Sequence, residues 1–261
     1  MDIGSYNISL QRLKDDERGM KMLKIQNLTK HYKGSSKGVT DINLHIEPGD
    51  IYAFIGHNGA GKTTTLKCVV GIHDFEQGQI WIDGISVKDK PLECKSQFAY
   101  IPDNPDLYEY LTGIQYLNFI ADIFGVEQSE REAYIGKYAD AFGITASLGD
   151  LISSYSHGMK QKLAIISALV HKPKLLILDE PFVGLDPQAA VVLKGVMREL
   201  CEQGGAIFFS THVLDVAEKL CNKVAIIKDG VLIKAGLMED IVKAGESLED
   251  IFMEVVCDEA D

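Results

Sequence analysis

The sequence predicts an α/β fold with a parallel sheet at its core, an N-terminal antiparallel β-subdomain and an inserted helical subdomain. From residue 23 onward, short runs rich in β-forming residues alternate with runs of helical periodicity. One long segment, about residues 103–172, shows helical spacing without a strand pattern. With 261 residues, of which 46% are hydrophobic, the chain can bury a substantial core.

The first elements in chain order predict the antiparallel part. Residues 23–28 and 41–46 alternate polar and apolar side chains, which is typical of strands with one buried face. Residues 47–50, with the sequence EPGD, predict a turn. The apolar run 51–55 that follows predicts a strand buried on both faces.

Later elements alternate in the same way. Strands are predicted at residues 79–82, 98–101, 175–178, 206–210, 223–227 and 231–235. Apolar residues recur at helical spacing over 114–124, and another helical stretch covers about 130–142, so the helical subdomain is placed at 103–172. We expect residues 22–244 to form a single domain. Residues 245–261 form a C-terminal helix and tail, with the amphipathic helix at about 248–256.

Composition excludes several classes of protein. Residues 1–21 are charged and lack a continuous apolar segment, so they predict a mobile N-terminal extension and not a secretory signal. No apolar run approaches the roughly 18 to 20 residues that span a bilayer. The net charge of −12 disfavours a nucleic-acid partner, because affinity for phosphate backbones rests on Lys and Arg. Five widely spaced cysteines without a CxxC pattern predict reduced thiols.

A glycine-rich loop follows the buried strand at 51–55. Residues 56–63 fit GxxxxGK[ST] between that strand and a helical run at 64–70, which predicts a P-loop NTPase core. Backbone N–H groups of such a loop converge on phosphate oxygens, Lys62 reaches the outer phosphates and the Thr63 hydroxyl ligates Mg²⁺. The candidate phosphate-binding residues are Gly56, Asn58, Gly59, Gly61, Lys62, Thr63 and Thr64.

Two carboxylates end the apolar strand at 175–178. Asp179, at the end of the strand, suits a contact with Mg²⁺. Glu180 points to the neighbouring side and suits the polarisation of an attacking water molecule. The presence of the P-loop favours this pairing over an ordinary solvated strand end.

A second candidate phosphate-binding element lies at residues 155–162, which read YSHGMKQK. Ser156 and Gly158 stand just ahead of a long apolar run of helical periodicity. A helix start there aims backbone N–H groups and a hydroxyl at an anion. Two such elements in one chain indicate that a nucleotide is gripped from two sides.

Over about residues 22–244 the sequence resembles the ATP-binding subunit of an ABC transporter, most closely the ABC-2 export-type class. Besides the motifs above, Tyr32 stands where the family stacks an aromatic ring on adenine, GLDP at 184–187 is similar to the D-loop, and His212 is similar to the switch histidine. In this family YSHGMKQK corresponds to the signature motif.

The resemblance implies a head-to-tail dimer around two ATP-Mg²⁺. Ser156 and the N–H of Gly158 then contact the γ-phosphate of the nucleotide that the opposite subunit holds. Glu180 and His212 are the implied catalytic residues, and Asp186 communicates between the two sites. The implied partners are a second ATPase subunit, identical or not, and integral membrane permease subunits, which place the chain in the cytoplasm on the inner face of the membrane.

Three positions depart from the family pattern. His157 replaces the first glycine of the signature and Met159 replaces its glutamine. Asp103 stands where many relatives have the glutamine of the Q-loop, and Gln97, before the strand, is a poor substitute. An aspartate can bind Mg²⁺ through an oxygen but is shorter than glutamine, so we expect Asp103 near the metal when the dimer is closed.

Other interpretations of the chain remain open. An apolar and aromatic cluster at residues 105–111 is expected to contact the permease, the alternative being that it packs the helical subdomain on the core. Export is expected, although import is not excluded. A non-transport ABC ATPase of DNA maintenance or translation would show a coiled-coil insertion, a basic face or tandem domains. A P-loop kinase would need an Arg-rich lid, and residues 103–172 contain only Arg131.

Overall fold

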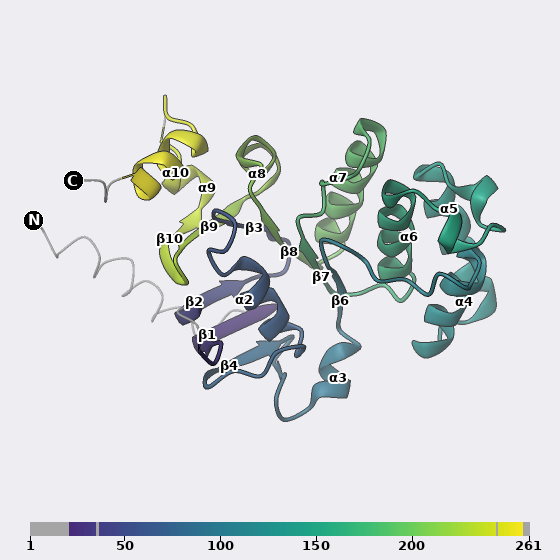
Figure 1. The fold of residues 1–261 in the computed structure, drawn as a ribbon, viewed down its shortest axis with the longest axis horizontal. Coiled ribbons are helices and arrows are strands. Elements are labelled where there is room, and N and C mark those ends of the chain that lie inside the picture. Colours follow the sequence, from purple (N-terminus) through teal and green to yellow (C-terminus); the bar gives the residue numbers. More distant parts are fainter. Residues whose placement is uncertain (1–20, 35–36, 244, 258–261) are drawn as a thin grey trace, which may run out of the picture.

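The computed structural model describes residues 21–34, 37–243 and 245–257. The predicted N-terminal extension therefore lies outside the described residues except for Lys21. Two sheets and a group of helices make up the described chain, and the helices α4, α5 and α6 lie at the end remote from β10 and α10 (Figure 1). The α/β prediction is confirmed, whereas the proposed division into domains at residues 22 and 244 stays a prediction.

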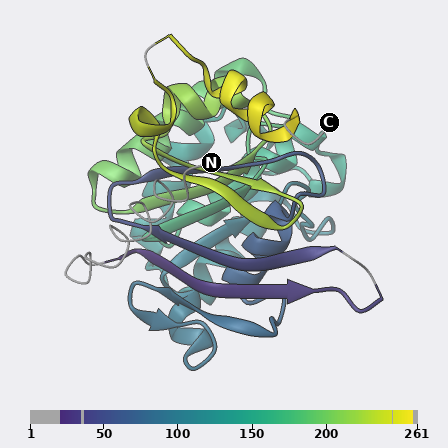
Figure 2. The same cartoon turned by 90° about the vertical axis from the view of Figure 1, so that its left-hand side faces the viewer.

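The N-terminal sheet is antiparallel, as predicted. Its strands are β1 (Leu23–His31), β2 (Gly38–Ile46), β4 (Gln77–Ile82) and β5 (Ile85–Ser86), in the order β2-β1-β4-β5. Apolar residues on alternate positions of β1, β2 and β4 face inward, because one face of this sheet is covered and the other is not. In Figure 2, β1 and β2 run across the molecule beneath the yellow C-terminal elements.

The second sheet has the order β10-β9-β3-β8-β7-β6, and all neighbouring pairs are parallel except β9 with β10. Every residue of β3, β7 and β8 is buried, which explains their continuous apolar sequences. Its strands are β3 (Ile51–Ile55), β6 (Phe98–Ile101), β7 (Leu175–Asp179), β8 (Ala206–Thr211), β9 (Lys223–Lys228) and β10 (Val231–Leu237).

Helices cover both faces of the second sheet. On one face, α2 (Lys62–Val69) packs in a core that the antiparallel sheet also lines. On the other face, α7 (Pro187–Glu202) and α8 (Leu214–Leu220) share a core with the helical segment. The shorter or peripheral helices are α3 (Pro91–Lys95), α9 (Met238–Ile241) and α10 (Leu248–Cys257).

Only helical elements separate β6 from β7, apart from an isolated bridge between Thr112 and Leu151. The segment consists of α4 (Gly113–Ile123), α5 (Gln128–Ala141), the 3₁₀ turns η1 (Thr145–Ser147) and η2 (Ile152–Ser154), and α6 (His157–Leu169). A capping box of Thr112 and Gln115 starts α4. The parallel strands β6 and β7 need a crossover, and this segment supplies it.

Several predicted strands are longer in the structure, and the two-residue strand β5 was not predicted. It pairs with β4 across the tight turn at Asp83 and Gly84, which both have positive φ. Cys68, Cys94, Cys201 and Cys221 are free thiols in the structure, and the reduced state of the protein stays a prediction. Among the described residues, no helix combines the length and the apolar character that a membrane span requires.

Candidate functional site

The glycine-rich loop joins β3 to α2 as predicted. Gly59 and Gly61 have φ of 86° and 111°, which side-chain-bearing residues rarely adopt. A Cβ at Gly61 would also lie 2.6 Å from Cγ1 of Val39, and a Cβ at Gly56 would lie 2.5 Å from the carbonyl oxygen of Ile227. These positions need glycine because the loop curls tightly against neighbouring strands.

A cavity of about 220 Å³ opens over this loop. It brings together most of the predicted nucleotide site from distant parts of the chain. Its predicted lining residues are Tyr32, Asn58, Gly59, Gly61, Lys62, Thr63, Thr64, Asp103 and Glu180. Lys37, Gly38 and His57 also line it; the sequence analysis missed these residues, although the loop after Tyr32 and the variable positions of the P-loop could have indicated them.

Lys62 is 6% exposed and its ammonium group is saturated by its own chain. Its Nζ donates to the carbonyl oxygen of Gly56 at 2.7 Å and to that of His57 at 3.4 Å. It also lies 3.4 Å from Oε1 of Glu180. The positive charge expected for the outer phosphates is thus held at the base of the cavity.

Asp179 ends β7 and is 1% exposed. Oδ1 accepts a hydrogen bond from the Ser210 hydroxyl on the adjacent strand β8, whereas the buried Oδ2 has no well-formed partner among the described residues. Burial raises the pKa of Asp179 above its ordinary value, and the charges of Asp103 and Glu180 act in the same direction. Hydrogen bonding from Ser210 and the nearby Thr63 hydroxyl opposes that shift.

The residues around Asp179 fit Mg²⁺. A buried carboxylate oxygen without a partner, next to the Thr63 hydroxyl and the Asp103 charge, is a combination that a divalent cation would satisfy. Mg²⁺ is commonly held by one or two carboxylates together with substrate phosphates. Accordingly, the described residues contain no cluster of three or more His, Cys, Asp or Glu side chains suited to a metal.

Glu180 follows Asp179 in a left-handed backbone conformation with φ of 49°. This turn in the chain sends the two adjacent carboxylates in different directions. The backbone N–H of Glu180 donates to Ser210, at 3.1 Å to the hydroxyl and 3.2 Å to the carbonyl oxygen. A non-glycine residue in this conformation costs about 1 to 3 kcal/mol unless its surroundings hold it, and β8 supplies that support.

His212 lies beside Glu180. Oε2 of Glu180 accepts from the His212 backbone N–H at 3.3 Å and lies 3.0 Å from Nδ1 of the ring. Oε1 faces Lys62, so Glu180, whose side chain is 15% exposed, is held between the two residues. Contacts on both oxygens therefore fix the position of the Glu180 carboxylate.

Tyr32 stands at the outer edge of the cavity, 37% exposed. Its hydroxyl lies 3.3 Å from Oγ1 of Thr64, and its ring packs edge-on to His73 with 5.8 Å between centroids. Nζ of Lys30 lies over the same ring, 5.8 Å from its centroid, and the predicted stacking of Tyr32 on adenine stays a prediction.

Ser156, Gly158 and Asp186 do not line this cavity, as far as the described residues show. Ser156 is exposed and caps α6 by accepting from the backbone N–H of Met159 at 3.3 Å. Asp186 caps α7 by accepting from Ala189 N–H at 2.8 Å. An ion pair with Lys162 and this cap hold the pKa of Asp186 below its ordinary value. These three residues therefore lie apart from the residues that line the cavity, and their predicted contact with a nucleotide stays a prediction.

Asp103 lines the cavity, but its Oδ1 accepts from the next backbone N–H, that of Asn104, at 2.9 Å. Its placement near Asp179 is compatible with the metal role that the sequence predicts. Gln97 precedes β6 at the opposite end of the strand, where its carbonyl accepts from Lys174 and Leu175. It is therefore remote from the cavity, as the sequence analysis expected.

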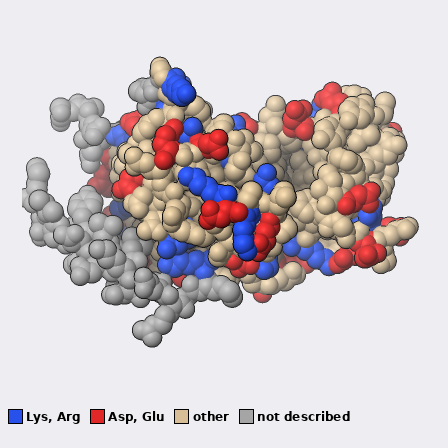
Figure 3. Space-filling view, turned by 90° about the horizontal axis from the view of Figure 1, so that it is seen from below, with Lys and Arg blue, Asp and Glu red and all other residues tan. Residues whose placement is uncertain are grey.

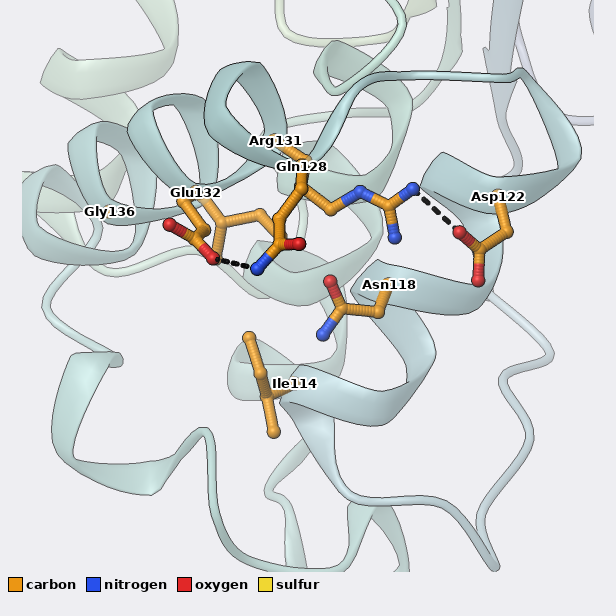
Figure 4. Close-up of a pocket in the computed structure, with 8 residues that line it drawn as sticks. Ile114, Asn118, Asp122, Gln128, Arg131, Glu132 and Gly136 are labelled. Carbon is orange, nitrogen blue, oxygen red and sulfur yellow. Dashed lines mark hydrogen bonds and ion pairs between the residues drawn. The ribbon is translucent and has the colours of Figure 1, made fainter.

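A larger cavity, about 670 Å³, lies between α4 and α5 (Figure 4). Four of its polar side chains bind one another in pairs. Arg131 forms an ion pair with Asp122 at 2.6 Å and donates to the Val126 carbonyl, and Gln128 donates to Glu132 at 2.9 Å. With these groups paired to one another, size alone does not make this cavity the functional site.

Comparisons with known proteins agree with this geometry. The family model described as ABC transporter matches residues 39–183. The ABC-type transporter ATP-binding protein EcsA of Bacillus subtilis (strain 168) is 33% identical over 245 residues, which cover 92% of this chain and 99% of EcsA.

Solved structures show the same fold. A structure of the ATP-binding subunit of an ABC transporter superposes with a TM-score of 0.86 at 34% identity, covering 90% of this chain and 99% of that one. A dimeric ATP-binding cassette in a post-hydrolysis state bound to ADP and Pi has a TM-score of 0.76 at 21% identity, covering 84% and 99%.

Proposed function

Since the chain belongs to the ABC transporter family of ATP-binding proteins, we propose that it hydrolyses ATP as one subunit of a multi-subunit exporter. In this proposal two ATPase subunits close around two ATP-Mg²⁺ and drive separate membrane permease subunits. The observation that supports it best is the placement of Glu180 between Lys62 and His212, beside the cavity over the P-loop.

In the proposed mechanism neighbouring side chains bind the phosphates, hold the metal and accept a proton. Lys62 and the loop N–H groups bind the outer phosphates, and Thr63 and Asp179 would hold Mg²⁺, with Asp103 nearby. When bound, the metal would neutralise charge on the phosphate oxygens. Glu180 accepts a proton from the attacking water molecule, while His212 keeps the carboxylate oriented and faces the γ-phosphate.

The second half-site must come from another subunit. Ser156 and Gly158 lie at the start of α6 and outside the cavity that holds Lys62 and Glu180. A hydroxyl and N–H groups at a helix start can donate to a phosphate, and a head-to-tail partner would bring them to it. The dimeric cassette described above, bound to ADP and Pi, supports this arrangement by analogy of fold.

An exposed aromatic surface supports a permease contact. Tyr110 is 76% exposed and stacks on Tyr108, whose ring also packs edge-on against Phe119. Pro105 and Leu107 of the same loop are buried, so they pack the helical segment on the core. The exposed rings of Tyr108 and Tyr110 are accessible to a partner. Aromatic side chains are enriched at protein interfaces.

Charge distribution gives no support to the alternative in nucleic-acid metabolism. On the face seen in Figure 3, basic and acidic side chains are interspersed, and the described residues of that face form no continuous basic surface. Export is favoured over import by the similarity of the signature to export-type ATPases, and localisation on the cytoplasmic side of the membrane follows from the proposed permease partners.

Glu180→Gln tests the proposal. The amide keeps the shape of the carboxylate but cannot accept the proton, so we expect ATP hydrolysis to fall roughly 10² to 10⁴-fold while ATP binding is retained. Because ATP is then trapped, the variant should form an ATP-dependent dimer, measured by analytical ultracentrifugation with and without ATP-Mg²⁺.

Lys62→Ala is the matched control. It should lose ATP binding itself, so it should neither hydrolyse nor dimerise with ATP. Unchanged turnover in Glu180→Gln would remove this residue from the role of base, and an ATP-trapped chain that stays monomeric at all concentrations would contradict the proposed two-sided site.

A further inference from the structure

The histidine of YSHGMKQK contacts the GLDP turn (residues 184–187). Gly184 has φ of 80°, and a Cβ added there would lie 2.6 Å from Cδ2 and 2.9 Å from Nε2 of His157. The ring of His157 therefore occupies the space that a side chain at position 184 would need. The bulky ring of His157 at the start of α6 and the missing side chain of Gly184 in the GLDP turn are therefore complementary in shape.

A second contact joins the same two elements through the backbone. A Cβ added at Gly158 would lie 2.9 Å from the carbonyl oxygen of Gly184. The first turn of α6 and the GLDP turn thus approach each other more closely than a side chain at Gly158 would permit. Close packing at this point leaves little freedom for either element to move alone.

An ion pair adds a third contact one turn further along α6. Nζ of Lys162 lies 2.6 Å from Oδ2 of Asp186, whose Oδ1 caps α7. The side chain of Lys162 is 15% exposed and that of Asp186 is 50% exposed, so solvent screens the pair from the aspartate side only. The starts of α6 and α7 are consequently tied to each other through a single carboxylate.

We propose that His157 and Lys162 are positioning residues that fasten Ser156 and Gly158 to the GLDP turn of the same chain. The GLDP turn follows Glu180 by four residues, so the phosphate-contacting half-site is linked to the segment that carries the subunit's own general base. Displacement of one half-site in the dimer is then transmitted to the other. The inference rests on the proposed function and adds residues for which that function assigns no role.

Lys162→Met provides the main test. Without the ion pair the first turn of α6 should loosen, and hydrogen exchange of amides in residues 156–160 should become faster in the nucleotide-free chain. In the Glu180→Gln background, ATP-dependent dimerisation should weaken by about tenfold, while the affinity of the monomer for ATP, which depends on the P-loop, should change less than twofold. Lys162→Arg should restore both properties.

Lys137→Met is the matched control, because Lys137 also ties the helical segment to α7, through Glu199 at 2.7 Å, but far from the GLDP turn. It should leave exchange in residues 156–160 and dimerisation unaltered. Wild-type exchange and wild-type dimerisation in Lys162→Met would overturn the proposal. A Glu180→Gln parent that does not dimerise would contradict the proposed function instead, and the exchange measurement would still decide the inference.

The steric contact has its own test. Gly184→Ala should lower the melting temperature by a larger amount in the wild-type background than in a His157→Gly background, because removal of the ring leaves only the backbone strain at position 184. Equal losses of melting temperature in the two backgrounds would show that His157 does not hold the turn.

Discussion

At the scale of single residues, two adjacent carboxylates acquire different properties from their surroundings. Asp179 is buried with one oxygen lacking a well-formed partner in the part of the chain that the structure describes, whereas Glu180 is held by Lys62 and His212. Burial without full compensation is costly to the empty protein. The buried Asp179 carboxylate therefore lowers the stability of the metal-free protein, while it provides a ligand for a cation.

Asp179→Asn tests that conflict. The pKa of Asp179 is raised by burial, so as pH rises above the ordinary aspartate value of about 3.9 the folded protein gives up the proton less readily than the unfolded chain. The charged form therefore costs stability at neutral pH, and the uncharged asparagine should raise the nucleotide-free melting temperature there. The gain should shrink towards pH 4.

The same variant should lose the additional stabilisation that ATP-Mg²⁺ gives the wild type, because its amide is a weaker ligand for the metal. Melting curves at several pH values, with and without ATP-Mg²⁺, measure both effects. A variant that is less stable than the wild type at pH 7 would contradict the account of Asp179.

Tyr100→Phe tests a second buried polar atom. The hydroxyl of Tyr100 is buried without a hydrogen-bond partner among the described residues. Its removal should therefore stabilise the nucleotide-free protein, by about 1 kcal/mol, or leave it unchanged. Chemical denaturation measures the free energy of unfolding.

Tyr155→Phe is the control for Tyr100→Phe. The Tyr155 hydroxyl donates to the Ser147 carbonyl at 2.6 Å, so its removal should cost about 1 kcal/mol. A comparable loss in Tyr100→Phe would reveal a partner for that hydroxyl.

At the scale of elements, helix α6 is anchored at its far end by a stacked pair. The ring of His171 stacks on Phe124 with 3.7 Å between centroids, and Nε2 lies 3.3 Å from the carbonyl oxygen of Phe98 in β6. A carbonyl only accepts, so Nε2 carries the proton, and Nδ1 is buried without a partner among the described residues. The helical segment is thereby joined to the sheet at the start of β6.

His171 predicts a pH dependence of stability. Burial lowers the pKa of His171 below the ordinary value of about 6.5, so the unfolded chain takes up a proton at a higher pH than the folded protein does. Its contribution to stability is complete above pH 6.5 and declines as pH falls from there towards the lowered value.

His171→Phe keeps the stacked ring but cannot titrate. The difference in unfolding free energy between wild type and variant, measured by denaturation from pH 5 to 8, should therefore favour the wild type at pH 8 and shrink or reverse towards pH 5. A difference that is constant over this range would contradict the role of His171.

The sequence predicts elements best where burial is uniform. The ranges 51–55 and 98–101 match β3 and β6 at both ends, because strands buried on both faces give uninterrupted apolar runs. Strand β5 has only two residues, which is too few to show a periodic pattern in the sequence. It is recognised as a strand only because it pairs with β4 in the folded chain. Helix α2 begins at Lys62, two residues before the predicted run, because the glycine at 61 and not the apolar pattern sets its start.

The candidate site likewise contains features that local sequence motifs predict and features that only the folded chain defines. The P-loop, Asp179 and Glu180 are local motifs. In the structure Glu180 lines the cavity over the P-loop and pairs with Lys62, and Asp179 lies beside Thr63. The positive φ of Glu180 and the contact of His157 with Gly184 depend on segments that approach only in the folded chain. No spacing in the sequence could indicate them.

At the scale of the whole molecule, charge opposes association. Each chain carries a net charge of −12, so the proposed dimer brings two strongly acidic molecules together. Long-range repulsion reaches about 30 Å at 0.01 M salt but only about 10 Å at 0.1 M. Short-range contacts through the nucleotide must overcome the electrostatic repulsion between the two chains that remains after screening by salt.

Salt should therefore strengthen the ATP-dependent dimer of Glu180→Gln. We expect its dissociation constant to fall severalfold when ionic strength is raised from about 0.01 to 0.1 M. Sedimentation of the variant over this range, with the monomer's ATP affinity measured in parallel, checks the effect. Stronger association at the lower ionic strength would indicate that local attraction, and not net charge, governs the interface.

The internal bonds of Lys62 have a consequence for the resting enzyme. Its ammonium group lies between two loop carbonyls and the carboxylate of Glu180 while no phosphate is present. In the proposed mechanism an arriving nucleotide would exchange partners with the lysine. That exchange would weaken the ion pair with Oε1 of Glu180, while the contacts of Oε2 with His212 remain. In the empty cavity the carboxylate is engaged with Lys62 and His212 of its own chain. In the proposed mechanism its Oε1 would become available to water once the phosphates bind the lysine.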